Sequence, residues 1–280
     1  MTTTSANPET DAMLQARYGD AKALLNGPHS AVIDALLSHR SVRAYADTPL
    51  PEGLLDTLMA AAQSASTSSN MQVWSAVAVQ DAGRKARLAA LAGDQAHVAK
   101  APLLLLFLAD LSRLRRIGDA QQAATPGLDY LESFVLGIVD AALAAQNTVV
   151  ALESLGLGCC FIGAMRNKPA EVAAELGLPP EAFVVFGLTV GYPDPQREAA
   201  IRPRLKPQAI LHRERYEIPA ETEQQLVAEY DGAMHRFQDS QGMPSIDWSR
   251  QMMRRVGSPE ALMGRHCLRD VLNKLGFKLT

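Results

Sequence analysis

One long apolar stretch, residues 130–155, constrains the fold of this chain more than any other feature. Apolar side chains fall on nearly every face of the helix that it predicts, and Gly156 follows where that helix would end. A helix without a clearly polar face must be covered by other protein on most sides. We therefore expect residues 130–155 to lie inside a core or in a subunit interface.

Shorter helices and strands are predicted on both sides of this helix. Strands are predicted at residues 73–79, 103–108, 159–162 and 183–190, and helices around 32–37 and at 51–65, 84–92, 169–176, 220–238, 245–255 and 259–275. No strand is followed by G-x-G-x-x-G, and no G-x-x-x-x-G-K-[ST] occurs in the sequence. Residues 156–163 (GLGCCFIG) have the wrong spacing. A Rossmann fold and a P-loop are therefore both disfavoured.

The first 28 residues are predicted to be an N-terminal extension. Residues 2–10 are polar and expected to be loose, whereas residues 11–25 can form a helix that Asn26-Gly27-Pro28 would end. The functional domain is therefore expected over residues 29–280.

Charge and cysteine content disfavour several classes of protein. The formal net charge is −3, so the chain lacks the basic excess of a nucleic-acid-binding protein. Its 3 cysteines are too few for a disulfide framework and fit a reducing compartment. The longest uninterrupted apolar run, Pro102–Ala109, is far shorter than the about 20 residues of a transmembrane helix. With no secretory signal evident, we expect a soluble, cytoplasmic protein that binds neither membrane nor nucleic acid.

The first candidate site is His39-Arg40-Ser41-Val42-Arg43, at a predicted junction of helix and loop. Two arginines and a serine so close together form a compact anion site, because the planar fork of arginine donates parallel hydrogen bonds to phosphate. The alternative is a solvated helix end, where basic residues also interact favourably with the helix dipole. Both interpretations stay open on this motif alone.

A second candidate is the turn Ser66-Thr67-Ser68-Ser69-Asn70-Met71-Gln72. Four consecutive hydroxyls followed by amides place many hydrogen-bonding groups in a small volume. Such a turn can bind a polar ring edge or a phosphate. The alternative is a turn that satisfies its side chains with local backbone hydrogen bonds.

A third candidate is Arg202-Pro203-Arg204. The proline stiffens the pair, so both guanidinium groups can face one anion. The alternative is a solvated, charged loop.

Other features give weaker indications. The six histidines lack metal-ligand spacing, so no metal site is expected. Cys159 and Cys160 lie in an apolar strand and are interpreted as buried structural thiols rather than a redox pair. Asn167 is interpreted as a helix cap, and residues 113–116 as a solvated basic face.

In order and spacing these motifs resemble the nitroreductase superfamily, most closely its oxygen-insensitive NADPH nitroreductases and NADPH–flavin oxidoreductases. The matching segments are HRSVRAY (39–45), STSSNMQ (66–72), GDQAHVAKAP (93–102), residues 139–167, FGLTVGYP (186–193) and RPRLKP (202–207). Agreement over so many separated segments is far more specific than any single motif.

The resemblance implies an α+β fold with a central, mainly antiparallel sheet flanked by helices. It further implies an intertwined homodimer with FMN at the subunit interface and residues 130–155 in the dimer core. By position, Arg40, Arg202 and Arg204 would hold the flavin phosphate, and Arg43 would lie near flavin N1 and the C2 carbonyl. The remaining residues that would line the FMN site are His39, Ser41, Val42, Thr67, Ser69, Met71, Gln95, Phe161, Ile162, Gly163 and Ala164.

The activity that the resemblance implies is two-electron, ping-pong hydride transfer. NAD(P)H would reduce the flavin and leave, and a nitroaromatic, a quinone or a second flavin would then take the electrons. Arg43 would stabilise the negative charge of the reduced flavin, and no side-chain general acid is implied. Two alternatives are a flavin reductase that supplies reduced FMN to a partner oxygenase and a non-enzymatic flavin-binding protein.

Three features depart from the pattern of that group. Its NADPH-binding arginine corresponds here to Gln241-Gly242, for which Arg236 or Arg250 are candidate substitutes. Ala164 stands at the glycine-rich flavin edge, where its methyl group would narrow the approach. The N-terminal extension has no counterpart in the group.

Overall fold

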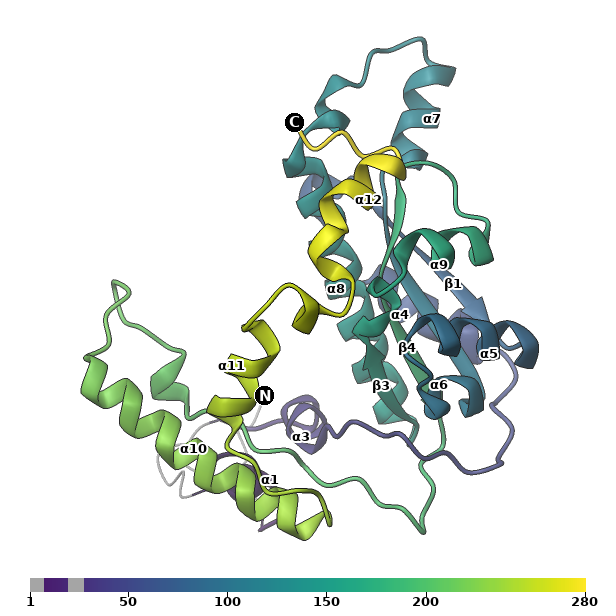
Figure 1. The fold of residues 1–280 in the computed structure, drawn as a ribbon. Coiled ribbons are helices and arrows are strands. Elements are labelled where there is room, and N and C mark those ends of the chain that lie inside the picture. The colour runs from purple at the N-terminus through teal and green to yellow at the C-terminus, as the bar shows by residue number, and fades with distance from the viewer. Residues whose placement is uncertain (1–7, 20–27) are drawn as a thin grey trace. The chain divides into compact units, whose positions relative to one another are not determined.

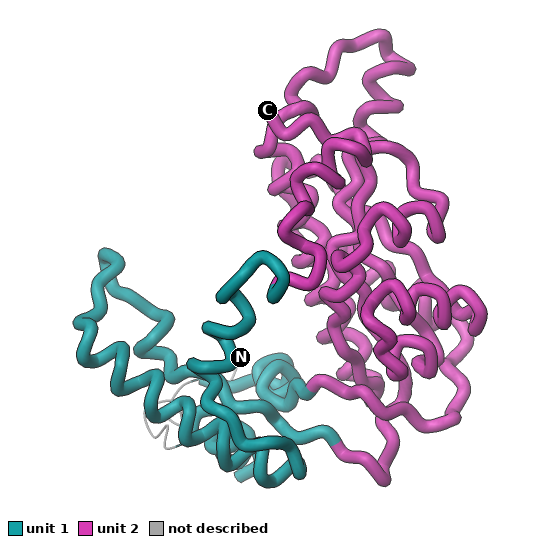
Figure 2. The backbone as a smooth tube through the Cα atoms, viewed as in Figure 1, with its two compact units in different colours: residues 1–40, 199–261 teal, residues 41–198, 262–280 magenta. Residues whose placement is uncertain are grey.

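The computed structural model describes residues 8–19 and 28–280. The chain divides into two compact units, each assembled from distant segments (Figure 2). Unit 1 comprises residues 1–40 and 199–261, and unit 2 comprises residues 41–198 and 262–280.

Unit 2 is built around a four-stranded antiparallel sheet (Figure 1). Its strands are β1 (Trp74–Val79), β2 (Leu103–Asp110), β3 (Gly158–Ile162) and β4 (Ala182–Gly191), in the order β1-β2-β4-β3. Each strand coincides with a predicted one to within two residues at either end. The expected α+β fold with an antiparallel sheet is confirmed, and β1 and β3 form its two edges.

The two faces of the sheet are covered by different helices. Leu103, Leu105 and Phe107 of β2 belong to one core, and the alternating Leu104 and Leu106 belong to the other, as the two-residue repeat of a strand requires. The helices that contribute to the first core are α4 (Leu54–Gln63), α8 (Leu131–Ser154) and α12 (Leu268–Lys274), and those of the second are α5 (Ala82–Leu91), α6 (Ala96–Lys100) and α9 (Pro169–Leu176).

Helix α8 is the helix predicted at residues 130–155, and Gly156, with a φ of 76°, follows it. Its 24 residues, with a mean hydropathy of 1.7 over the most apolar window, are long and apolar enough to cross a membrane. The expectation that no segment is long and apolar enough to span a membrane is therefore wrong. That expectation was based only on uninterrupted apolar runs, whereas α8 includes Asp140 within a mostly apolar helix. Ala141, Ala144 and Val149 of α8 are fully buried in the first core, so α8 is the core helix of unit 2.

Helix α7 (Ser112–Ala120) follows β2 and was not predicted. Arg115 of α7 donates hydrogen bonds to both carboxylate oxygens of Glu181, at 2.6 and 3.0 Å, and to Asp129 at 2.7 Å. The interpretation of residues 113–116 as a solvated face is therefore wrong for Arg115. This side chain ties α7 to the residue that precedes β4.

The C-terminal part of the chain is less regular than predicted. Instead of one helix at residues 259–275, short 3-10 turns precede helix α12 (Leu268–Lys274). Met263 and Gly264 have φ angles of 55° and 86°, and an α-helix cannot continue through this left-handed backbone. The 3-10 turns of the chain are η1 (Ser68–Asn70), η2 (Pro126–Asp129), η3 (Gly163–Arg166), η4 (Pro207–Ala209), η5 (Glu260–Leu262) and η6 (Arg265–Cys267).

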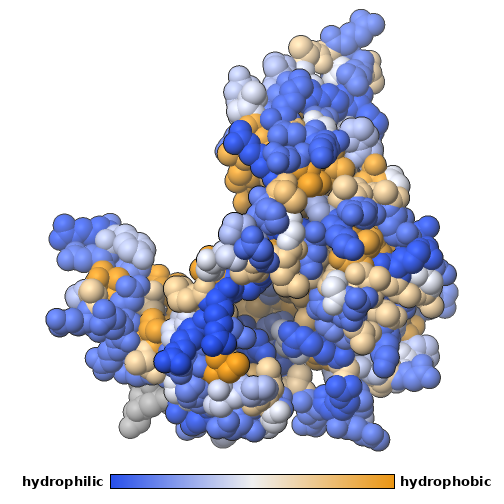
Figure 3. All heavy atoms as spheres, in the orientation of Figure 1, coloured by the Kyte–Doolittle hydropathy of each residue, from blue (hydrophilic) through white to orange (hydrophobic). Residues whose placement is uncertain are grey.

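The described part of unit 1 is helical. Its helices are α1 (Pro8–Tyr18), α3 (Ala31–Ser38), α10 (Ala220–Ser240) and α11 (Trp248–Val256). Helix α1 begins within the segment expected to be loose and ends at Tyr18, and the rest of the helix predicted at 11–25 lies largely outside the described residues. Both units expose apolar side chains among the charged ones (Figure 3).

Candidate functional site

The segment after Arg40 lies along the edge strand β3. Ser41 forms a parallel bridge with Cys159, and the amide of Val42 donates to the carbonyl of Cys159 at 2.8 Å. The Val42 side chain is only 3% exposed, and a Cβ on Gly158 would lie 2.5 Å from it. Gly158 therefore allows the first arginine motif to approach the sheet closely.

Tyr45 anchors the same segment two residues beyond Arg43. Its hydroxyl donates to the carbonyl of Val42 at 2.8 Å and shares a 2.6 Å hydrogen bond with Thr189 of β4. Burial raises the pKa of Tyr45 far above its usual value, so the phenol stays protonated and keeps donating. This fixes the backbone on both sides of Arg43.

Arg43 lies close enough to His97 for its positive charge to act on the imidazole ring. His97 is a residue that the motifs did not single out. Burial lowers the pKa of His97, and the positive charge of Arg43 lowers it further. His97 is in α6, whose N-cap position is the predicted site residue Gln95. The Gln95 side chain donates to the carbonyl of Ala92 at 2.8 Å.

The hydroxyl turn is held by a buried carboxylate that sequence reasoning missed. Asp140 of α8 accepts a 2.6 Å hydrogen bond from the Thr67 hydroxyl, one of 3.3 Å from the amide of Ser68 and one of 3.2 Å from the amide of Val73. The Thr67 hydroxyl in turn accepts from the amide of Gln72 at 3.1 Å. Asp140 interrupts an otherwise apolar run, which was the signal available in the sequence.

The backbone of this turn is strained. Ser69, Asn70 and Gln72 have φ angles of 49°, 55° and 51°, in the left-handed region that disfavours residues other than glycine. The hydrogen bonds to Asp140 and Thr67 hold the turn in this shape. The predicted residue Ser69 is one of the strained positions.

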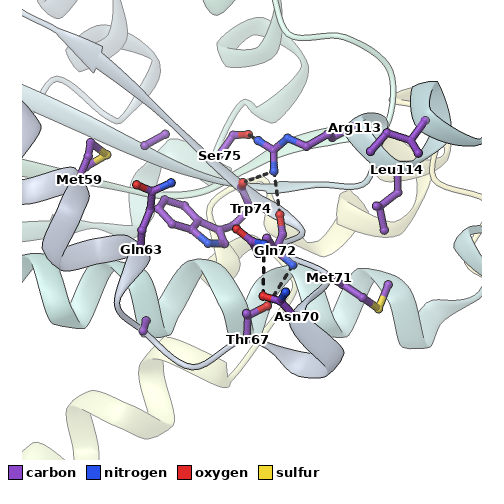
Figure 4. Close-up of a pocket in the computed structure, with 13 residues that line it drawn as sticks. Met59, Gln63, Thr67, Asn70, Met71, Gln72, Trp74, Ser75, Arg113 and Leu114 are labelled. Carbon is purple, nitrogen blue, oxygen red and sulfur yellow. Dashed lines mark hydrogen bonds between the residues drawn. The ribbon is translucent and has the colours of Figure 1, made fainter. Parts of the chain in front are cut away.

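A pocket of about 760 Å³ opens beside this turn (Figure 4). Arg113 borders it and donates to the carbonyl of Gln72 and the hydroxyl of Ser75, both at 2.8 Å. Two predicted site residues, Thr67 and Met71, line the pocket. Its other lining residues are Met59, Gln63, Ala65, Asn70, Gln72, Trp74, Ser75, Ala76, Arg113, Leu114 and Ile117.

The C-terminal end of β3 presents an aromatic ring and a small-residue turn. Phe161 is exposed and packs edge-on against Phe186, with ring centroids 5.0 Å apart, whereas Ile162 is buried. Gly163 and Ala164 open the turn η3. Arg166, which the motif analysis also missed, donates to the carbonyl of Val185, and burial lowers its pKa.

Two weaker interpretations of nearby residues are resolved. Cys159 and Cys160 are both buried and neither forms a disulfide, and burial strongly raises the pKa of Cys159, so the expectation of structural thiols is confirmed. Asn167 does not cap α9, which has no side-chain cap, so that expectation is wrong. Its side-chain oxygen instead accepts a 2.9 Å hydrogen bond from Arg265.

Unit 1 carries the other predicted arginines. Arg40 donates to the carbonyl of Ser38 at 3.3 Å, and Arg204 donates to the carbonyls of Arg202 and Pro203 at 3.3 and 3.1 Å. The Arg202 guanidinium lies 5.3 Å from the ring centre of Phe237. Carbonyl oxygens do not neutralise a guanidinium, so Arg40 and Arg204 keep their positive charge for an anion.

Apart from Gln95 at the start of α6, the predicted residues of unit 2 fall into two groups at opposite edges of one sheet. The turn around Thr67 and Met71 precedes the edge strand β1, whereas Ser41 and Phe161 belong to the edge at β3. Three strand spacings, about 14 Å, separate the edges.

Within the described ranges, 8–19 and 28–280, no cluster of His, Cys, Asp and Glu could hold a metal ion.

The chain was compared with known families and proteins. The sequence model of the Nitroreductase family matches residues 36–192, and that of the Nitroreductase family C-terminal domain matches residues 202–280. Together they include every predicted site residue. The chain belongs to the nitroreductase family.

Similar proteins cover almost the whole of this chain. The FMN reductase (NADPH) of Bacillus subtilis is 34% identical over 248 residues, which are 88% of this chain and 97% of that protein. The FMN reductase [NAD(P)H] of the same organism is 37% identical over 254 residues, 89% of this chain and 98% of that protein. The structure of the hypothetical oxidoreductase YcnD from Bacillus subtilis is 34% identical, with a TM-score of 0.83 over 90% of this chain and 99% of that one.

Proposed function

We propose that this protein is an FMN-dependent NAD(P)H oxidoreductase that reduces nitroaromatics, quinones or similar small-molecule acceptors. The observation that carries the proposal is the similarity to two FMN reductases, which accounts for 97% and 98% of their lengths. The family matches, at residues 36–192 and 202–280, include every predicted site residue. The co-substrate is NADPH or NADH, in keeping with the names of those relatives.

The chemistry of the site residues fits a flavin mononucleotide. Arg40, Arg202 and Arg204 supply guanidinium groups that suit the phosphate. The exposed ring of Phe161 suits contact with an aromatic heterocycle, and Gly163 opens the turn that follows β3. FMN, when bound, would accept a hydride from the nicotinamide and pass two electrons to the acceptor.

Arg43 is the residue that we assign to electrostatic stabilisation of the reduced cofactor. Its backbone is fixed by the hydrogen bonds of Tyr45 and by the pairing of Val42 with β3. A positive charge carried on an ordered backbone segment needs less reorganisation when negative charge develops nearby. The chain supplies no side chain that we assign as a proton donor, so solvent supplies protons in this proposal.

A homodimer completes the site in this proposal. The two groups of site residues in unit 2 lie at opposite sheet edges, so two copies of the chain offer a way for both groups to contact one flavin. Helix α8 supports this with a stripe of exposed apolar residues at four-residue spacing: Leu131, Val135, Val139 and Leu143. Such a stripe on a core helix suits a subunit interface.

A second candidate function keeps the flavin but changes the acceptor. Two relatives are named FMN reductases, which suits free FMN as an acceptor, but neither name indicates a partner oxygenase. A non-enzymatic flavin-binding role has no comparable support, because the related proteins carry enzyme names. We place the protein in the cytoplasm.

Purified protein tests the proposal directly. The protein should be yellow, release FMN on heating and oxidise NADPH or NADH in parallel assays. Double-reciprocal lines for a nitroaromatic acceptor should be parallel, as ping-pong exchange requires, and intersecting lines would refute that exchange. Fast turnover of free FMN with poor nitroaromatic rates would favour the second candidate, and slow flavin reduction by both nucleotides would contradict both.

A further inference from the structure

Helix α1 belongs to the N-terminal extension, outside the part of the chain that defines the family. The first of the two family matches begins at residue 36 and the second at residue 202, and the aligned parts of this chain already account for 97% and 98% of the two FMN reductases. Helix α1 is nevertheless packed into unit 1, since Leu14 is 4% exposed and Thr10 1% exposed. The Thr10 hydroxyl donates to Asp34 of α3 at 2.8 Å.

The most informative residue of α1 is Arg17. It is 6% exposed, although arginine is rarely buried unless hydrogen bonds satisfy it. One guanidinium nitrogen, Nη2, donates to the carbonyl of Leu37 at 2.8 Å and to that of His39 at 2.9 Å. The other terminal nitrogen, Nη1, makes a longer contact of 3.5 Å with the carbonyl of Arg202.

The backbone of Arg17 makes a further connection to the same region. Its carbonyl accepts a 2.8 Å hydrogen bond from the amide of Arg204. A single residue of the extension therefore contacts the segment directly before Arg40 and both arginines of the Arg202-Pro203-Arg204 motif. These two segments lie about 160 positions apart in sequence and are the ones assigned above to the phosphate of FMN.

We propose that α1 acts as an intramolecular clamp on the phosphate-binding segments, with Arg17 as its positioning residue. This inference rests on the proposed FMN function. The planar guanidinium fixes the spacing of the Leu37–His39 backbone relative to residues 202–204, which aligns Arg40 and Arg204 before the phosphate arrives. Loops ordered in advance lose less conformational entropy on binding, so the clamp raises affinity for the phosphate without touching it.

Comparing FMN with riboflavin tests this role, because riboflavin has the same ring and ribityl chain but lacks the phosphate. We would measure the Kd of both ligands by flavin fluorescence with the full-length apoprotein and its R17M, R17K and R213M variants. R17M should bind FMN about tenfold more weakly while its riboflavin affinity stays unchanged. R17K, which keeps the charge but lacks the fork, should fall between R17M and the wild type.

The control variant R213M removes an exposed arginine from the same unit and should change neither Kd. Equal weakening of FMN and riboflavin in R17M would indicate a general structural role and overturn the clamp, as would unchanged binding of FMN. If R17M is insoluble, R17Q takes its place under the same criteria. A wild-type chain that binds no FMN would instead refute the proposed function, so the two failures are distinguishable.

Discussion

At the scale of single residues, Arg43 is the proposed electrostatic partner of the reduced cofactor. A unit charge about 4 Å away contributes about 4 kcal/mol at an effective dielectric of 20, before desolvation. Because about 30 mV corresponds to 1.4 kcal/mol for a two-electron couple, R43A should lower the flavin midpoint potential by tens of millivolts. FMN should remain largely bound, since the phosphate is assigned to other arginines.

A redox titration of the FMN-loaded R43A variant measures this shift. R213A, which removes an exposed arginine from the loop that precedes α10, is the matched control and should leave the potential unchanged. A midpoint in R43A equal to that of the wild type would remove Arg43 from its assigned role.

The NADPH-binding arginine of the group is replaced here by Gln241-Gly242. Of its two candidate substitutes, Arg236 is better placed than Arg250 to bind the additional phosphate of NADPH. Arg250, the alternative from the sequence, forms an ion pair with Asp247 at 3.2 Å. Arg236 instead lines a pocket of about 330 Å³ in unit 1, together with Arg204 and Lys206. R236A should raise the KM for NADPH about tenfold and leave the KM for NADH unchanged, because only NADPH carries the additional phosphate.

Steady-state assays with both nucleotides measure this selectivity, with R250A as the comparison variant. If R250A loses NADPH selectivity and R236A keeps it, the assignment is wrong. A similar rise in the KM for both nucleotides would point to a general effect on nucleotide binding.

The motifs identified the polar residues of the proposed site more readily than the residues that hold them in place. Arg40, Thr67 and Arg204 stand in segments where several donors follow one another, and such segments are visible in a sequence. Asp140 and Tyr45 act on residues distant in sequence, and their buried partners are defined only by the packing of helix and sheet. Their roles depend on tertiary contacts that local patterns do not encode.

At the scale of an element, the hydroxyl turn depends on Asp140. D140A should lower the free energy of unfolding by about 3 kcal/mol, because it leaves the buried amide of Val73 and the hydroxyl of Thr67 without their acceptor. D140N should lower the free energy of unfolding less, since the carbonyl oxygen of asparagine still accepts hydrogen bonds. In D140A the strained turn should also become looser, which should weaken FMN binding.

Urea denaturation of both variants tests the order of these effects. E132Q, at an exposed position near the start of α8, is a control that should unfold like the wild type. If D140A unfolds at the wild-type midpoint, Asp140 does not hold the turn.

Long or strongly patterned elements were predicted best. The helix at residues 169–176 matches α9, with Pro169 at its first turn and Gly177 in a left-handed conformation at its end. Helix α6 was missed because it has only 5 residues, and α7 because Leu114 and Ile117 are its only long apolar side chains and stand among basic residues. The break at Gly264 was missed because its backbone is set by the carbonyl of Asn167, which would lie 2.7 Å from a Cβ.

At the scale of the whole molecule, the family resemblance indicated the fold class correctly, whereas sequence patterns alone did not order the strands. The order β1-β2-β4-β3 puts the hydroxyl turn and the first arginine motif at different edges. Hydrophobic alternation along a strand identifies its faces but not its neighbours. This separation is the physical reason why the proposed site calls for a second copy of the chain.

The stripe of exposed apolar residues on α8 allows the proposed homodimer to be tested by introducing one charged side chain. V139E places a carboxylate in the middle of the stripe, one helical turn from both Val135 and Leu143. Burying that charge in an apolar interface without a partner costs several kcal/mol, so the dimer should dissociate. A90E adds the same charge to an exposed position of α5, which covers the other face of the sheet, and should leave assembly intact. Light scattering coupled to size exclusion should find V139E monomeric and depleted of FMN, whereas a V139E dimer with full FMN content would contradict an interface on α8.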